Sequence, residues 1–327
     1  MKKYTFYFAI IVGTLLILVT LLSLLYNVQL WFLKVLDFPR LQTLIGLLVC
    51  MALFVWLNRT WRYPAVLFSA GLVVSIILQS TYIVPYTPLA GKAVPSGKKT
   101  EQNTLKLMVA NVWMKNNKAD TFLNIVREAN PDVLLVMETN EWWNNQLSGL
   151  QSVYPYKVLY PLDNTYGMLL YSKYKLENPQ VKFLKHKRVP SIHSNVIFPN
   201  GKKFRLYAMH PVPPVPSKHP DNIGGKEVEL IKVGRMVKNR DLPVVVAGDF
   251  NDVAWSRTSR LFGTESRLAD VRVGRGLYNT FDAKSFLLRW PLDHIFVSNE
   301  FGVADVQRLP KFGSDHFPIM ATLTLPE

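Results

Sequence analysis

The chain has 327 residues, of which 49% are hydrophobic, and its mean hydropathy of +0.10 is high for a soluble protein. Its net charge of +15 comprises +5 in residues 1–90 and +10 in residues 91–327. A basic surface favours anionic partners, namely nucleic acid, phosphorylated small molecules or anionic lipid headgroups, and the single cysteine excludes a disulfide framework.

Three apolar runs near the amino terminus, Tyr4–Leu33, Leu41–Leu57 and Pro64–Tyr82, are each predicted to span a membrane as a helix, since about 20 apolar residues cross a bilayer. A cleaved signal peptide is the alternative for the first run. It is disfavoured because the run is about twice the usual length and no small-residue cleavage site follows it. A buried soluble hairpin is the alternative for the other two, which no charged residue interrupts. Residues 1–84 are therefore predicted to form a membrane domain.

The distribution of cations predicts the orientation of these helices. Cations accumulate on the cytoplasmic side of membrane proteins. The amino terminus and the loop after the second run together carry more cations than the loop after the first run: Lys2, Lys3, Arg59 and Arg62, against Lys34 and Arg40 with Asp37. We therefore expect a multi-pass protein of the cell membrane whose residues after 85 lie outside the cytoplasm. The reverse topology is the alternative.

Residues 85–103 are rich in Pro, Gly, Lys and polar residues and are predicted to be a linker to a domain of residues 104–327. In that domain, predicted strands outnumber predicted helices and do not alternate with them regularly, which favours an α+β or layered sandwich fold. The predicted strands are 105–112, 132–137, 167–172, 191–198, 204–209, 244–247, 294–297 and 319–325, and the predicted helices are 120–129 and 225–239.

Polar side chains recur at the ends of these strands, where a rigid core presents groups to a ligand. They are Asn111, Glu138, His210, Asp249, Asn251, Asp293, Asp315 and His316. Carboxylate and amide oxygens suit Mg²⁺ or Mn²⁺, and the absence of a HExxH helix argues against a zinc peptidase. His316 is a candidate base that Asp293 would orient. Together these residue types predict metal-assisted hydrolysis of a phosphoester.

Seven segments in this order resemble the motifs of the endonuclease/exonuclease/phosphatase superfamily, which includes deoxyribonuclease I-like nucleases, abasic-site endonucleases, inositol phosphatases and neutral sphingomyelinases. They are VANVWMKN, PDVLLVMETN, YGMLLYSKY, MHPVPP, VVVAGDFNDVAWS, PLDHIFVS and GSDHFPIM. The resemblance covers roughly residues 104–326. It implies a four-layer α/β sandwich in which two packed mixed β-sheets are flanked by helices.

The resemblance also implies a role for each matching residue. Glu138 matches the principal metal-binding glutamate, Asn111 an asparagine near the metal, and Asp315 a further carboxylate at or near it. His210 matches a group that contacts the scissile phosphate. Asp249 and Asn251 match the pair that positions the attacking water and the phosphate oxygens, and Asp293 matches the partner of the catalytic His316. Either Asp249 or His316 takes the proton from water.

The implied protein is a membrane-anchored, Mg²⁺-dependent phosphoesterase. Its substrate class stays open between extracytoplasmic DNA or RNA and a lipid-linked phosphate or pyrophosphate. The basic run at residues 182–191 fits nucleic acid, lipid phosphate or plain solvent exposure. A non-enzymatic binding module predicts lost catalytic residues, and every motif position here is intact.

Overall fold

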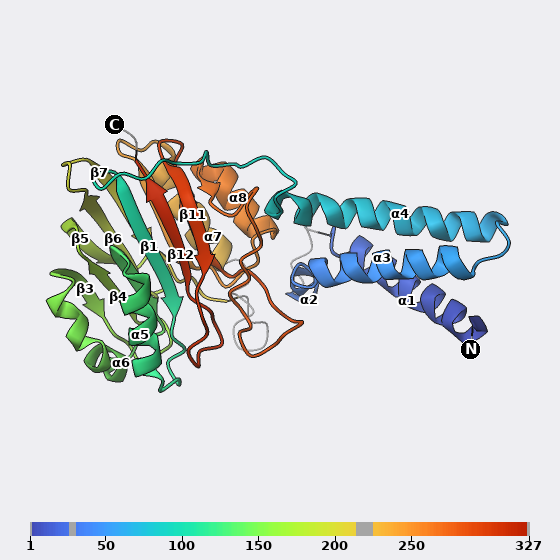
Figure 1. The fold of residues 1–327 in the computed structure, drawn as a ribbon, viewed down its shortest axis with the longest axis horizontal. Coiled ribbons are helices and arrows are strands. Elements are labelled where there is room, and N and C mark those ends of the chain that lie inside the picture. Colours follow the sequence, from blue (N-terminus) through green and yellow to red (C-terminus); the bar gives the residue numbers. More distant parts are fainter. Residues whose placement is uncertain (1, 26–30, 214–224, 326–327) are drawn as a thin grey trace.

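The computed structural model describes residues 2–25, 31–213 and 225–325. A bundle of helices extends from one end of a layered α/β domain (Figure 1). Its long helices are α1 (Lys2–Leu22), α3 (Arg40–Leu57) and α4 (Tyr63–Ile83), and a short helix, α2 (Trp31–Val35), precedes α3. Helix α1, helix α3 and the segment Tyr63–Tyr86 are long and apolar enough to cross a membrane.

The first apolar run differs from the single helix predicted through Leu33. Helix α1 ends at Leu22, residues 26–30 lie outside the described residues, and α2 is a separate helix. The Ser23 hydroxyl donates to the carbonyl of Thr20 (2.7 Å), and the Ser23 carbonyl accepts from Arg40 Nη2 (3.2 Å). These bonds join the end of α1 to the Arg40 side chain at the start of α3.

The domain contains two six-stranded mixed sheets. The first has the order β11-β12-β1-β2-β4-β3 and the second β5-β6-β7-β8-β10-β9. The strands of the first are β1 (Thr104–Asn111), β2 (Val133–Met137), β3 (Tyr156–Tyr160), β4 (Met168–Ser172), β11 (Gly302–Arg308) and β12 (Ile319–Thr324). Those of the second are β5 (Lys175–Lys182), β6 (Ser191–Ile197), β7 (Lys203–Ala208), β8 (Val244–Asp249), β9 (Ala269–Asp270) and β10 (Asp293–Val297).

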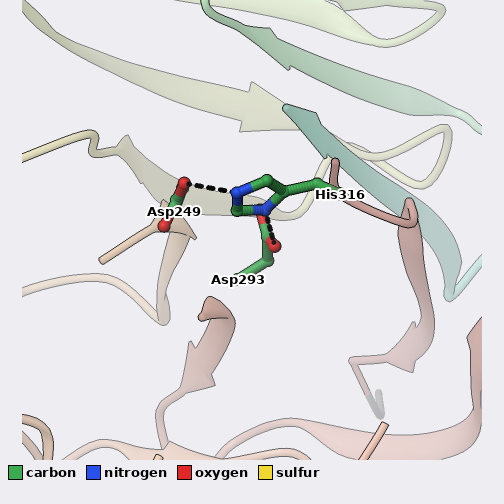
Figure 2. A group of neighbouring side chains, drawn as sticks. All are labelled: Asp249, Asp293 and His316. Atoms are coloured by element: carbon green, nitrogen blue, oxygen red, sulfur yellow. Dashed lines mark hydrogen bonds and ion pairs between the residues drawn. The ribbon is translucent and has the colours of Figure 1, made fainter. Parts of the chain in front are cut away.

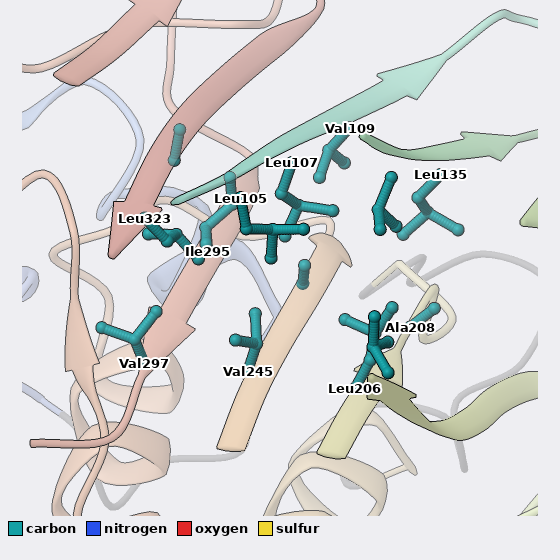
Figure 3. Packing of buried hydrophobic residues seen from close by; sticks show 14 of the residues in the cluster. Leu105, Leu107, Val109, Leu135, Leu206, Ala208, Val245, Ile295, Val297 and Leu323 are labelled. Atoms are coloured by element: carbon teal, nitrogen blue, oxygen red, sulfur yellow. The ribbon is translucent and has the colours of Figure 1, made fainter. Parts of the chain in front are cut away.

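The two sheets pack face to face, and helices cover their outer faces, so the predicted four-layer sandwich is confirmed. Between the sheets, fully buried side chains such as Leu107, Val109, Leu135, Val245 and Ile295 form one apolar cluster (Figure 3). Apolar residues of α5 (Ala119–Ala129) and α6 (Glu141–Gln146) pack on the first sheet. Those of α7 (Gly225–Lys238) and α8 (Arg257–Ser266) pack on the second.

The helix bundle is docked directly on the domain. The Trp255 indole N–H donates to the carbonyl of Asp37 (2.7 Å), and the Tyr86 hydroxyl donates to the carbonyl of Ala254 (2.7 Å). An apolar cluster surrounds these bonds, with Tyr82 and Ile83 of α4 packed beside Val253, Ala254 and Trp255. The connecting residues 85–103 also lie on the domain, since Val94 is buried and the Gly97 amide donates to the Val303 carbonyl (3.1 Å). The contact surface begins two residues after Asn251.

A buried polar network ties the domain-side ends of the three long helices together. The Arg40 guanidinium is fully buried and donates to Asp37 (2.6 Å) and to Gln79 (3.1 Å). Gln79 in turn donates to the Thr20 hydroxyl (3.1 Å), and Arg40 also stacks over the Tyr82 ring at 3.7 Å. A buried guanidinium is tolerated only when its donors are paired. This network therefore fixes how the helices meet beneath the docking surface.

The second sheet contains a buried histidine that makes stability depend on pH. Burial, followed by the charges of Lys182 and Arg205, lowers the pKa of His193 from 6.5 to about 4. The unfolded chain binds this proton near pH 6.5 and the folded chain only near pH 4, so stability present above pH 6.5 is lost as the pH falls toward 4. We expect a loss on the order of 3 kcal/mol, at about 1.4 kcal/mol per pKa unit. His193→Gln should weaken the fall in melting temperature between pH 7 and pH 4.5; an identical fall in both proteins would contradict this.

Candidate active site

The predicted site residues lie at one end of the central strands of both sheets. Asn111 ends β1 and Glu138 follows its parallel neighbour β2, while Asp249 ends β8. Asp293 begins β10 and is paired in register with Asp249 on the antiparallel neighbour. Parallel strands end at the same edge of a sheet, and β1 and β2 face β8 across the core. The topology therefore brings Asn111, Glu138, Asp249 and Asp293 together.

Asn111 bridges two carboxylates. Its side-chain amide donates to Glu138 Oε1 (2.8 Å) and to Asp249 Oδ2 (3.1 Å), while its own oxygen accepts from the Trp113 backbone amide (2.9 Å). Asn111 and Asp249 are fully buried, and Glu138 is half-buried. One amide group thus holds two acidic side chains close together, one from each sheet.

The turn after β8 aims Asp249 into the site. The backbone amide of Asn251 donates to Asp249 Oδ1 (2.7 Å), and the Asn251 side chain donates to the Pro211 carbonyl (2.9 Å). Gly248 has a φ of +145°, and a Cβ added there would lie 1.9 Å from the Met209 carbonyl oxygen. Only glycine fits so close to the neighbouring strand. The backbone of the Gly-Asp-Phe-Asn sequence thus fixes the position of the Asp249 carboxylate.

His316 and Asp293 form a buried pair, shown with Asp249 in Figure 2. Asp293 Oδ2 accepts from His316 Nδ1 at 2.8 Å, and His316 Nε2 faces Asp249 Oδ2 at 3.6 Å. Burial alone lowers the pKa of His316, but the nearby carboxylates, Asp293 first and then Asp249, outweigh burial and raise the pKa to about 10. The two carboxylates therefore favour the protonated form of the imidazole.

His210 is a further neighbour of Asp249. Its Nε2 lies 3.9 Å from Asp249 Oδ2, and its Nδ1 has no hydrogen-bond partner among the described residues. The Tyr166 ring packs on it at a centroid distance of 5.3 Å. Burial and then the charges of Glu138, Glu229 and Asp249 raise the pKa of the Tyr166 hydroxyl to about 12. Tyr166 is thus a further site residue, which the strand-end search did not select although it opens the YGMLLYSKY motif.

Asp315 lies at the margin of the site. Its carboxylate accepts a weak hydrogen bond from Ser314 Oγ (3.4 Å), and within the described residues no hydrogen bond or ion pair joins it to the other predicted side chains. Its backbone carbonyl accepts from the Ala283 amide (2.7 Å), and the Phe281 ring packs on His316 at 5.0 Å. Residues 281–283, which the sequence did not single out, therefore form one wall of the site.

The residues present fit a divalent cation. Asp249, Asp293 and His316 each offer a ligand atom, and these atoms lie within 4.8 Å of one another. Glu138 adds a fourth ionisable group through the shared Asn111 amide. Asp293 Oδ1 is buried and has no hydrogen-bond partner among the described residues. Carboxylates gathered this closely repel each other unless a cation lies among them, and oxygen donors are those that Mg²⁺ and Mn²⁺ prefer.

Solved structures with the same fold cover the domain. A structure of D. rerio TDP2 humanized by 14 mutations has a TM-score of 0.56 and 18% identity, covering 68% of this chain and 99% of its own. The human Nocturnin catalytic domain has a TM-score of 0.55 and 15% identity, with coverage of 68% and 95%. An endonuclease/exonuclease/phosphatase from Bacteroides vulgatus has a TM-score of 0.55 and 18% identity, with coverage of 70% and 100%. No curated protein sequence matches the chain.

The model of one protein family matches residues 108–316, which is most of the domain and more than half of the chain. All the strand-end residues described above, from Asn111 to His316, lie within this match. The chain therefore belongs to the Endonuclease/Exonuclease/phosphatase family, whose members are metal-dependent hydrolases of phosphoric ester bonds.

Proposed function

We propose that the protein is a membrane-anchored, Mg²⁺-dependent phosphoesterase that cleaves phosphodiester or phosphomonoester bonds outside the cytoplasm. The convergence of Asn111, Glu138, Asp249, Asp293 and His316 from five separate strand ends supports this function most strongly. Its division into a membrane part (1–84), a connection (85–103) and a catalytic part (104–327) is part of the same proposal.

Glu138 would hold the cation, and Asn111 keeps the Glu138 carboxylate beside that of Asp249. When bound, Mg²⁺ supplies positive charge that stabilises the phosphate oxygens as negative charge builds up. Asp315, next to His316 in the chain, contributes a further negative charge near the cation. His210 also lies beside Asp249, where its ring can donate to a phosphate oxygen, and Asn251 holds the Asp249 carboxylate through its backbone amide.

Asp249 is the better candidate for the group that takes the proton from water. His316 Nδ1 is bonded to Asp293 and its Nε2 faces Asp249, and these two carboxylates raise the pKa of the imidazole, which favours a proton donor over a proton acceptor at this position. We therefore assign His316 to stabilising the phosphate as a donor, Asp293 to orienting it, and Asp249 to accepting the proton.

The bundle supports anchorage and orientation. Helices of 21, 18 and 21 residues are roughly 27–32 Å long, close to the thickness of a bilayer core. Because Arg40 is buried against Asp37, it adds little to the charge of the loop after α1. Among the remaining cations, Lys2, Lys3, Arg59 and Arg62 at one end of the bundle outnumber Lys34 at the other. This difference favours a cytoplasmic location for the end with four cations, and therefore a domain outside the cytoplasm.

Removal of the metal is expected to abolish hydrolysis. We expect the purified full-length chain to cleave bis(p-nitrophenyl) phosphate with Mg²⁺, to stop in EDTA, and to recover when Mg²⁺ is added in excess. Glu138→Gln should raise the Mg²⁺ concentration needed for half-maximal rate at least about tenfold. Glu141→Gln, the same change at an exposed position on α6, is the matched control. Hydrolysis that persists in EDTA would contradict the proposal.

A nuclease is the second candidate. The net charge of +10 on residues 91–327 favours nucleic acid, and one similar structure is that of D. rerio TDP2 with a single-strand DNA product. Cleavage of plasmid DNA at a rate above that of lipid phosphates would favour this function.

A further inference from the structure

Residues 282–289, here called the tip loop, carry an unusual apolar surface. Phe286, Leu287 and Leu288 are 85%, 75% and 52% exposed. Elsewhere in the described part of residues 104–325, exposed large hydrophobic residues occur singly. Leaving such side chains in water instead of burying them is unfavourable. Three in a row therefore mark a surface that is covered when the protein is in its working environment.

The tip loop lies beside the helices that we propose to be membrane-spanning. Gln42 Nε2 donates to the Leu287 carbonyl at 3.0 Å. Gln42 belongs to the first turn of α3, and the first turn of α3 lies at the same end of the bundle as the last turns of α1 and α4 (Figure 1). If α3 spans the bilayer, its first turn lies where the apolar layer meets the headgroups. The backbone of Leu287 is therefore held at that level.

The charges of the tip loop suit the same location. Lys284 and Arg289 flank the three apolar residues. Apolar side chains between cations are typical of surfaces that enter the boundary between acyl chains and phosphate headgroups. Arg289 Nε is fixed by the Ser285 carbonyl (2.6 Å), and the Leu288 amide is bonded to the Ser285 hydroxyl (2.9 Å), so the loop holds its shape without a partner.

The other end of the tip loop is the wall of the site. Phe281 packs on His316, and the Ala283 amide is bonded to the Asp315 carbonyl. Lys284 lies over the Trp113 ring at 3.6 Å, and Trp113 is bonded to Asn111. Four residues thus separate Phe281, whose ring packs on His316, from Phe286, the first exposed apolar residue of the tip loop. The tip loop is therefore continuous in the chain with the wall of the site.

We propose that the tip loop is seated in the surface of the bilayer that holds the helices, and that the substrate is a phosphate ester carried by a membrane lipid, not nucleic acid in solution. This inference rests on the proposed phosphoesterase function and names its substrate class. A base can stack on one aromatic ring such as Phe286, but a lipid presents a continuous apolar tail next to its phosphate, which matches three consecutive apolar side chains better.

Seating of the loop can be measured without any substrate. In a Cys50→Ala background, Leu287→Cys carries a nitroxide spin label in full-length protein reconstituted into phosphatidylcholine vesicles containing one part in five of phosphatidylglycerol. Val153→Cys is the control, because Val153 is 53% exposed. It follows the 3₁₀ helix after α6, and α6 lies at the side of the domain away from the bundle of α1, α3 and α4. We expect the label at 287 to be relaxed by oxygen and protected from a water-soluble nickel chelate, and the label at 153 to show the reverse. Equal access of the chelate to both would overturn the proposal.

Substrate presentation is tested with two probes in the same reconstituted protein. Phe286→Ser/Leu287→Ser should lower hydrolysis of a polyprenyl pyrophosphate or phosphatidic acid in those vesicles at least about tenfold and leave hydrolysis of soluble bis(p-nitrophenyl) phosphate unchanged. Equal effects on both probes, or cleavage of plasmid DNA by a wild-type protein that leaves both lipids intact, would overturn the substrate class. Failure to hydrolyse every probe would instead refute the phosphoesterase function, while the spin label still reports where the loop lies.

Discussion

Asp249→Asn is expected to lower kcat for phosphoester hydrolysis about 10³-fold. The carboxylate accepts from Asn111 and Asn251 and lies within 3.9 Å of His210 and His316, so it is the common neighbour of these four residues. Asparagine keeps the shape but removes both the negative charge and the proton acceptor. General-base catalysis contributes about 10²–10⁴-fold, and loss of a charge at a metal site adds to that.

The measurement is steady-state hydrolysis of bis(p-nitrophenyl) phosphate at saturating Mg²⁺, with the melting temperature as a check that the variant folds. Asp241→Asn makes the same chemical change at a side chain that is 72% exposed, and we expect it to be neutral. A variant that retains more than a tenth of wild-type kcat would show that Asp249 is not the proton acceptor. An effect confined to KM would assign it to binding alone.

Arg40→Met is expected to destabilise the protein by about 3–5 kcal/mol. Removal of one partner from a buried ion pair leaves the other as an uncompensated buried charge. Burial already raises the pKa of Asp37 to about 6 against the opposing effect of Arg40. Gln79, the Ser23 carbonyl and the Tyr82 ring lose their cationic partner at the same time. Thermal unfolding in detergent micelles, followed by circular dichroism, measures the loss.

A double variant separates the ion pair from simple packing. Asp37→Leu/Arg40→Met removes both charges, and it should recover most of the stability because apolar replacements of a buried pair are often neutral. Arg59→Met, at an exposed position between α3 and α4, is the matched control and should change stability by less than about 0.5 kcal/mol. If Arg40→Met behaves like the control, the network does not hold the bundle.

The sequence predicts the central strands because their residues are mostly apolar. Strands β1, β2 and β8 are apolar along most of their length and buried on both faces, so each reads as a continuous run. Edge strands lack that signal. Strand β5 reads KLENPQVK, is largely exposed, and contains an irregularity between Glu177 and Gln180 with Asn178 at a φ of +51°. Strands β3 and β11 and helix α8, which are also mostly polar or half-exposed, are missed for the same reason.

The identity of the site residues follows from strand ends, but their partners do not. Pattern alone selects Asn111 and Glu138, yet only the fold shows that one amide serves both Glu138 and Asp249, 138 residues from Asn111. The strand-end argument could also have selected Tyr166, since this residue stands just before β4. Trp255 and Asp37 are 218 residues apart in the sequence, so no local sequence pattern predicts the hydrogen bond between them.

The docking surface makes shedding of the catalytic domain unfavourable. A cut in residues 85–103 would leave the halves joined by the Trp255 and Tyr86 hydrogen bonds and by the apolar cluster around them. Full separation would expose Val253, Ala254 and Trp255 to water within six residues of Asp249, at a cost of several kcal/mol. In the proposed membrane-anchored protein, the catalytic domain therefore acts only at the membrane that its helices span, and diffusion in the plane of that membrane sets its range.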